Sequence, residues 1–118
     1  MFMILFILHD PEHLNSILSA WDEVGVKGIT VLPSTGLARL KEDSILREDM
    51  PLIPSLEDMF NHVENLNRTL ITIIQDETIL ERVISATQAI IGDLNEPNTG
   101  ILSVIPLYRV YGLDRKDD

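Results

Sequence analysis

The sequence predicts an α+β domain in which an antiparallel sheet carries two helices on one of its faces. Short apolar runs have the composition of strands, longer segments repeat apolar residues at helical spacing, and the order strand–helix–strand occurs twice along the chain. This order is a doubled split βαβ unit. The strands are expected at 1–8, 29–37, 70–74 and 101–105, and the helices at 11–24 and 77–91.

The first expected strand is apolar on both of its faces. Successive side chains of a strand point to opposite faces. The residues that point one way are Phe2, Ile4, Phe6 and Leu8, and those that point the other way are Met3, Leu5 and Ile7. Apolarity on both faces is typical of a central strand that is covered on both sides.

The first helix has clear start and stop signals. Asp10 is a suitable N-cap, Pro11 suits the first helical position, and Glu12 suits the first turn. Gly25 follows the last periodic residue, where a left-handed C′ residue is most readily glycine. Gly28 then precedes the β-branched second strand, and we expect it to let the backbone approach another group closely.

The region from 40 to 67 interrupts this pattern. Charges of both signs alternate over 41–49 with little periodicity, and Pro51 and Pro54 follow. We expect an exposed excursion that contains a short helix at 56–64.

The second half of the chain repeats the strand–helix–strand order. Asp76 is the expected N-cap of the second helix and Gly92 its C′ residue. A turn-rich loop at 93–100 precedes the last strand, and 108–111 is a candidate for a short fifth strand. Residues 114–118 are expected to be a frayed tail.

Composition excludes several classes of function. A length of 118 residues indicates a single domain that spans 1–118, and the absence of cysteine excludes disulfides and thiolate metal sites. The net charge of −10 argues against nucleic-acid binding. The apolar start of the chain is too short for membrane insertion, so we expect a cytoplasmic protein. Enzyme signatures such as G-x-S-x-G, a P-loop or H-E-x-x-H are missing, so we expect no enzyme activity.

Two helices can cover only one face of the expected sheet. The other face is also apolar along the first strand, so something else has to cover it. Another copy of the same chain is the simplest cover, which predicts a homo-oligomer.

The arrangement is ferredoxin-like, and one stretch gives a more specific resemblance. Residues 23–31, Glu-Val-Gly-Val-Lys-Gly-Ile-Thr-Val, resemble the E-x-G-V-x-G-x-T-V segment of the PII nitrogen-regulatory signalling proteins. Gly36 and Arg39 fall where that family has a glycine and an arginine entering its T-loop. Residues 75–77 and 100–106 are similar to its second half, so the resemblance covers the chain apart from the excursion.

The resemblance implies a homotrimer with ligand clefts between its subunits. It implies that a small-molecule effector such as an adenine nucleotide binds there, and that residues 40–67 engage a protein partner, either a transporter or an enzyme. Thr30 would hydrogen-bond an adenine edge or serve only as a β-branched strand residue. Arg39 would pair with phosphate or be solvated at the loop mouth. The implied ligand-binding residues are Gly28, Ile29, Thr30, Gly36, Arg39, Gly100 and Arg109.

The sequence departs from the family at the phosphate end of this site. The family's glycine-aspartate-glycine-lysine pattern falls on Asn98, Thr99, Gly100 and Ile101. A lysine makes charge-assisted hydrogen bonds to phosphate, which Ile101 cannot make. We therefore expect any bound adenine nucleotide to be a monophosphate or diphosphate rather than a triphosphate.

Other interpretations stay open at this point. One is a trimeric scaffold of the related ion-tolerance (CutA-like) type, which interacts with partners without binding a nucleotide. Another is a small hydrolase, because ferredoxin-like folds include acyl-phosphate hydrolases. His9, Asp10 and His13 have metal-ligand chemistry, but Asp10 is accounted for as a helix cap, so we expect no metal site there.

Overall fold

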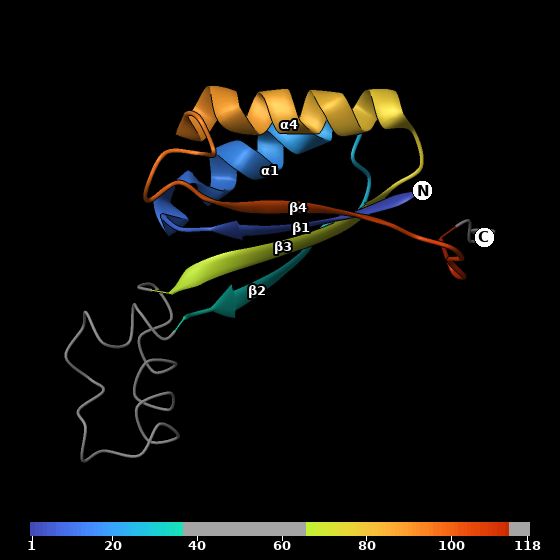
Figure 1. Ribbon diagram of the computed structural model, residues 1–118, viewed down its shortest axis with the longest axis horizontal. Helices are drawn as coiled ribbons and strands as arrows, with labels where there is room; N and C mark the ends of the chain where they lie inside the picture. Colours follow the sequence, from blue (N-terminus) through green and yellow to red (C-terminus); the bar gives the residue numbers. More distant parts are fainter. Residues whose placement is uncertain (37–65, 114–118) are drawn as a thin grey trace, which may run out of the picture.

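The chain forms a four-stranded antiparallel sheet with two helices packed on one face (Figure 1). The computed structural model describes residues 1–36 and 66–113. The strands are β1 (Phe2–Leu8), β2 (Thr30–Ser34), β3 (Asn67–Ile74) and β4 (Gly100–Pro106), and the helices are α1 (Leu14–Glu23) and α4 (Glu77–Ile91). The sheet order is β2-β3-β1-β4, which is consistent with a ferredoxin-like arrangement. The predicted α+β fold, with an antiparallel sheet and helices on one side, is confirmed at this level.

β1 occupies the centre of the sheet, as its sequence predicts. It pairs with β3 on one side and with β4 on the other, so that Leu5 lies opposite both Ile71 and Ser103. Residues directly opposite each other in an antiparallel pair point to the same face. The register therefore assigns each residue of the sheet either to the face that the helices cover or to the other face.

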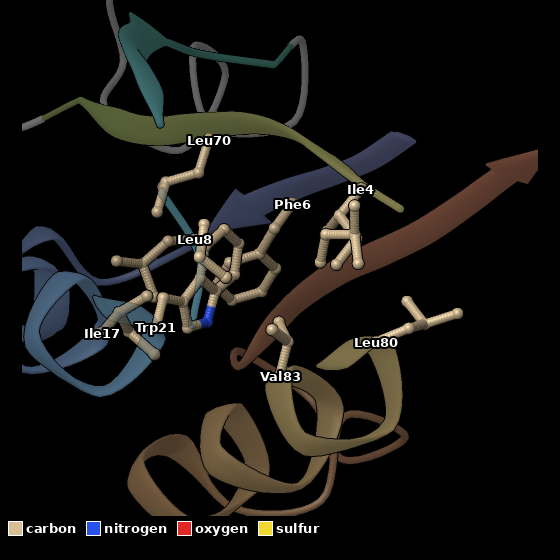
Figure 2. Packing of buried hydrophobic residues seen from close by; sticks show 10 residues of the cluster. Ile4, Phe6, Leu8, Ile17, Trp21, Leu70, Leu80 and Val83 are labelled. Carbon is tan, nitrogen blue, oxygen red and sulfur yellow. The ribbon is translucent and has the colours of Figure 1, made fainter. Parts of the chain in front are cut away.

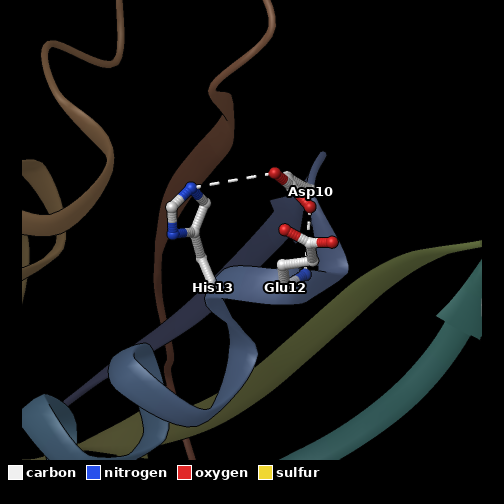
Figure 3. Close-up of polar contacts among 3 residues, drawn as sticks. All are labelled: Asp10, Glu12 and His13. Carbon is white, nitrogen blue, oxygen red and sulfur yellow. Dashed lines mark hydrogen bonds and ion pairs between the residues drawn. The ribbon is translucent and has the colours of Figure 1, made fainter.

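The first helix begins where predicted, although its first turn is a 3-10 turn, η1 (Pro11–His13). Asp10 Oδ1 accepts a hydrogen bond from the backbone N–H of Glu12 at 3.0 Å (Figure 3). This bond is the predicted N-cap. His13 Nε2 lies 3.8 Å from Asp10 Oδ2, and such exposed pairs contribute little to stability.

The second helix has the bounds that its caps predict. Asp76 Oδ1 accepts a hydrogen bond from the backbone N–H of Thr78 at 2.8 Å. At the other end Gly92 adopts φ 90°, and its N–H donates to the carbonyl of Gln88 at 2.9 Å. Residues 77–91 are therefore a helix whose two ends are both satisfied locally.

The hydrophobic core lies between the sheet and the two helices (Figure 2). Phe6 of β1 and Trp21 of α1 have ring centroids 6.0 Å apart. The indole Nε1–H of Trp21 donates to Thr87 Oγ1 at 2.9 Å, and that hydroxyl donates to the carbonyl of Val83 at 2.7 Å. The buried polar groups of this cluster are thus paired, as burial requires. Other fully buried members of the core are Ile4, Leu8, Ile17 and Leu70.

The opposite face of the sheet carries no helix within residues 1–36 and 66–113. Ile101 is 64% exposed and Leu32 is 46% exposed on this face. We call it the open face, and its apolar members by register are Met3, Leu5, Ile7, Leu32, Ile71, Ile73, Ile101 and Ile105. β1 was predicted to be covered on both faces. Within one chain the described residues cover only the face that carries Ile4, Phe6 and Leu8.

The predicted fifth strand is wrong for the single chain. Residues 108–111 adopt no strand, although the N–H of Leu107 still donates to the carbonyl of Met1 at 3.0 Å. A strand needs a partner for its backbone groups, and the described chain offers these residues none. β3 begins at Asn67, earlier than predicted, because its first residues pair with the end of β2.

Several predicted features lie outside the described residues. They are the short helix at 56–64, residues 40–65 of the predicted excursion, and the tail at 114–118. In the part of the chain that the structure describes, neither helix is long and apolar enough to cross a membrane.

Candidate functional site

A cleft of about 910 Å³ opens at one end of the sheet. It lies where the connection between α1 and β2 passes the turn from β3 into α4. Isoleucines form much of its wall, and backbone, hydroxyl and amide groups complete it. The lining comes from residues 25–28 and Thr30, from residues 71–76, and from Ile79 and Leu113.

The turn at residues 25–28 forms part of the cleft wall and lies beside α4 and β3. Gly25 adopts φ 111°, and a Cβ there would lie 3.3 Å from Cδ1 of Ile79. Both the positive φ and the nearby helix favour glycine at this position. Three residues later the carbonyl of Gly28 accepts a hydrogen bond from Thr72 Oγ1 at 2.5 Å. The turn therefore passes close to α4 at Gly25, and a hydrogen bond holds it to β3 at Gly28.

Two of the sequence-predicted ligand residues line this cleft. Gly28 and Thr30 both do so and are exposed, whereas Ile29 between them packs against the core. A Cβ on Gly28 would meet no atom within 4 Å. The close approach predicted for Gly28 is therefore not made by any described residue of the same chain.

Gly36 and Gly100 lie away from the cleft, at the other end of the sheet. Gly36 lies two residues after the end of β2, and a Cβ there would also meet nothing within 4 Å. Gly100 opens β4 with φ 149°, and a Cβ there would lie 2.5 Å from the carbonyl oxygen of Ile7. Packing within the chain is thus sufficient reason for a glycine at this position. Arg39 lies outside the described residues.

The predicted residues fall on opposite edges of the sheet. β2, which carries Thr30, and β4, which begins at Gly100, are the two outer strands. Three strand spacings of about 4.8 Å separate such edges by roughly 14 Å. One chain therefore does not bring the two groups of predicted residues into a single site.

Arg109 lies on the C-terminal arm, which we define as residues 107–113. The arm leaves β4 at the same end of the sheet as the cleft (Figure 1). The guanidinium carbon of Arg109 lies over the ring of Tyr108, 5.1 Å from its centroid, which is cation–π geometry. Leu113, at the end of the arm, lines the cleft, but Arg109 does not.

The loop between α4 and β4 uses its polar groups internally. The N–H of Asn95 donates to Asp93 Oδ1 at 2.9 Å, and the N–H of Leu94 donates to Gln88 Oε1 at 3.1 Å. The N–H of Glu96 donates to the carbonyl of Asp93 at 2.9 Å. Backbone donors that are already paired within the loop are not available to cradle a phosphate. The carboxylates of the loop also oppose an anion there.

The cleft carries little charge. Lys27 is the cation and Asp76 the carboxylate in its described lining, and Asp76 Oδ1 is occupied by the helix cap. The arrangement suits a ligand that buries apolar surface, makes a few hydrogen bonds and carries at most a small negative charge. The described residues contain no group of three or more side chains that could hold a metal ion.

Sequence reasoning found only Gly28 and Thr30 among the residues that line the cleft. Lys27, Thr72, Gln75 and Leu113 are among those that it missed. Thr72 was detectable in principle, because it is a buried polar residue within an otherwise apolar strand segment. Leu113 gave no signal, since only the path of the arm brings it to the cleft.

No known family model matches the chain, and no curated protein matches it either.

Proposed function

We propose that this protein is a PII-like signal transduction protein that senses a small molecule. It assembles as a homotrimer, binds its ligand in clefts between subunits, and regulates a transporter or an enzyme through residues 40–67. It acts as a regulator rather than as an enzyme. Support comes from the ferredoxin-like order of elements and from the resemblance of residues 23–31 to the PII segment.

The observation that carries the proposal is the position of the stretch that gave the resemblance. Gly28 and Thr30 line a cleft of about 910 Å³, which is in the range of small-molecule sites. Thr72 holds the same turn in place through the carbonyl of Gly28. Packing within the chain does not require a glycine at position 28, because a Cβ there would meet no atom within 4 Å. A ligand that approaches this side of the backbone would explain why the position has no side chain.

The open face supports the self-association. Each of the four strands contributes apolar side chains to it, beside polar ones such as Thr69 and Ser103, and one chain leaves it uncovered within the described residues. Apolar patches of this kind mark interaction surfaces. Because Thr30 and Gly100 occupy opposite edges, a site that contains both needs two copies in head-to-tail contact. Such contacts form a ring where the rotation between copies closes, as in the proposed trimer.

The cleft favours a nucleotide with few phosphates. Lys27 is the one cation in its described lining. An adenosine monophosphate or diphosphate therefore fits better than a triphosphate, whose additional charges need further cations.

Two measurements test the proposal together. Light scattering behind a sizing column should give the mass of three chains. A thermal-shift screen against nucleotides and central metabolites should find a compound that raises the unfolding midpoint, because a ligand of the native state stabilises it. A trimer that no compound stabilises would favour the interaction scaffold instead. A clean monomer at micromolar concentration would refute the PII-like assembly.

A matched pair of variants locates the ligand. Thr30→Val removes a hydroxyl from the cleft. Thr69→Val removes a hydroxyl that lies outside the cleft and donates to Ser34 Oγ at 2.8 Å. The ligand-induced shift should shrink in Thr30→Val and persist in Thr69→Val. Equal shifts in both variants would place the ligand elsewhere.

A further inference from the structure

Thr72 is a polar residue at a position of β3 that would suit an apolar one. It lies on the face that the helices cover, opposite Ile4 of β1. Its neighbours along β3 on the same face, Leu70 and Ile74, are apolar and buried, and Thr72 itself is only 3% exposed. Burial of a hydroxyl costs free energy unless the hydroxyl is hydrogen-bonded, so a buried threonine in this setting indicates a specific partner.

The partner of Thr72 is the turn that forms part of the cleft wall. Thr72 Oγ1 donates to the carbonyl of Gly28 at 2.5 Å, and both residues line the cleft together with Lys27 and Thr30. Among the described residues, this is the one hydrogen bond that reaches Lys27 or Gly28. We infer that Thr72 is a positioning residue of the ligand site, which holds this turn in the conformation that binds an adenosine phosphate. This inference rests on the proposed function, because it concerns the same cleft.

The turn needs such a hydrogen bond because its sequence restricts its backbone little. Glycine has more accessible backbone conformations than other residues, and the turn contains both Gly25 and Gly28. Strand pairing begins only at Thr30, which lies opposite Ile71. A wall that is fixed before the ligand arrives avoids the entropy cost of ordering it on binding. The Thr72 hydroxyl therefore contributes to affinity through the turn, and not through a contact of its own with the ligand.

Thr87 is a natural control, since it is the other buried polar residue among those that the structure describes. Its hydroxyl also donates to a backbone carbonyl, that of Val83, and it accepts the indole N–H of Trp21. Thr87 does not line the cleft. Loss of either hydroxyl should destabilise the fold, but only loss of the Thr72 hydroxyl should weaken ligand binding.

Titration calorimetry of the assembled full-length protein with adenosine monophosphate and adenosine diphosphate tests this inference. Thr72→Val keeps the branched shape of the side chain and removes the hydroxyl. It should weaken binding of the tighter nucleotide roughly three- to tenfold, the factor that corresponds to one neutral hydrogen bond. Thr72→Ser retains a hydroxyl and should bind within about twofold of the unchanged protein. Thr87→Val should bind as tightly as the unchanged protein.

The comparison of the two valine variants separates positioning from a general loss of stability. Urea unfolding should show that both are destabilised, and calorimetry well below their unfolding midpoints then reports on folded protein. Equal weakening of binding in Thr72→Val and Thr87→Val would overturn the inference, and so would unchanged binding in Thr72→Val.

A measurement on the unchanged protein tests the inference even if Thr72→Val does not fold. Backbone order parameters from nuclear magnetic resonance should show Lys27 and Gly28 as rigid without a nucleotide as with one, because the turn is fixed in advance. A turn that becomes ordered only when the nucleotide is added would overturn the inference.

The outcomes also distinguish this inference from the proposed function. If the trimer binds a nucleotide and Thr72→Val binds it equally well, the sensor function stands and the positioning role is refuted. If neither nucleotide binds but another metabolite stabilises the trimer, the sensor function also stands and the inference, which is stated for an adenosine phosphate, is refuted. If no compound binds at all, both are refuted.

Discussion

The two faces of the central strand β1 are alike in their apolar sequence and very different in their burial. Along β1, Ile4, Phe6 and Leu8 are completely buried under the helices, whereas the residues between them are only half-buried. Both sets are apolar, so hydrophobicity alone does not distinguish them. The difference shows that one set stabilises the fold of the single chain. The other set is available for association, which is how an uncovered apolar face is generally used.

The largest expected difference between the faces is in the free energy of unfolding. Phe6→Ala should lower it by about 3–5 kcal/mol, because the change leaves a cavity beside Trp21. Leu5→Ala, on the open face, should cost much less in the isolated chain. Urea unfolding measured over a range of protein concentrations compares them. The Leu5→Ala effect should grow with concentration and the Phe6→Ala effect should not. Equal costs at every concentration would mean that the faces are not distinct.

A charge on the open face should act on assembly rather than on folding. Ile7→Lys places an ammonium group opposite Ile101, and an unpaired charge that becomes buried on association costs several kcal/mol. Circular dichroism should show the fold retained, and light scattering should show single chains at micromolar concentration. Ser19→Lys, on an exposed position of α1, is the control and should stay assembled. An assembled Ile7→Lys would exclude the open face as the interface.

On the covered face, loss of the hydrogen bond between Trp21 and Thr87 should lower the free energy of unfolding by less than loss of the Phe6 ring. Thr87→Val leaves the buried indole N–H of Trp21 without its acceptor, which should cost about 1–3 kcal/mol. Thr87→Ser keeps the hydroxyl and should recover most of this loss. Urea unfolding, followed by the fluorescence of the single tryptophan, measures both variants. A Thr87→Val protein as stable as the unchanged one would show that the N–H finds another partner.

The smallest expected effect on the free energy of unfolding comes from the N-caps of the two helices that cover one face of the sheet. Asp76→Ala removes the acceptor for the Thr78 N–H and should cost about 1 kcal/mol. Asp10→Ala caps only a three-residue 3-10 turn and should cost less. Thermal unfolding of the two variants side by side gives the comparison. A larger loss in Asp10→Ala would reverse this order of importance.

Local patterns in the sequence were enough to predict the helices and the central strand. The cap at Asp10, the cap at Asp76 and the stop at Gly92 depend on bonds to residues two to four positions away. The alternation along β1 depends only on strand geometry. Such features are determined within a few residues, so sequence alone could place them.

The sequence also located part of the candidate site. Gly28 and Thr30 were predicted as ligand residues and line the cleft. Gly100 was also predicted, but it lies away from the cleft, and the nearby carbonyl of Ile7 explains why this position is a glycine. The sequence could not separate these cases, because both involve a glycine next to a strand. Only the position of the neighbouring backbone tells them apart.

The tertiary structure decided what depends on partners far away in the chain. Residues 108–111 have a sequence suited to a strand but form none, since a strand exists only where an edge is present to pair with it. Thr72 of β3 bonds Gly28 in the connection that leads into the neighbouring strand β2, and Leu113 joins the same cleft from the end of the arm. Strand register and the course of the arm bring these residues together. Because those are set by the packing of the whole chain and not by any local pattern, the sequence alone did not reveal the cleft.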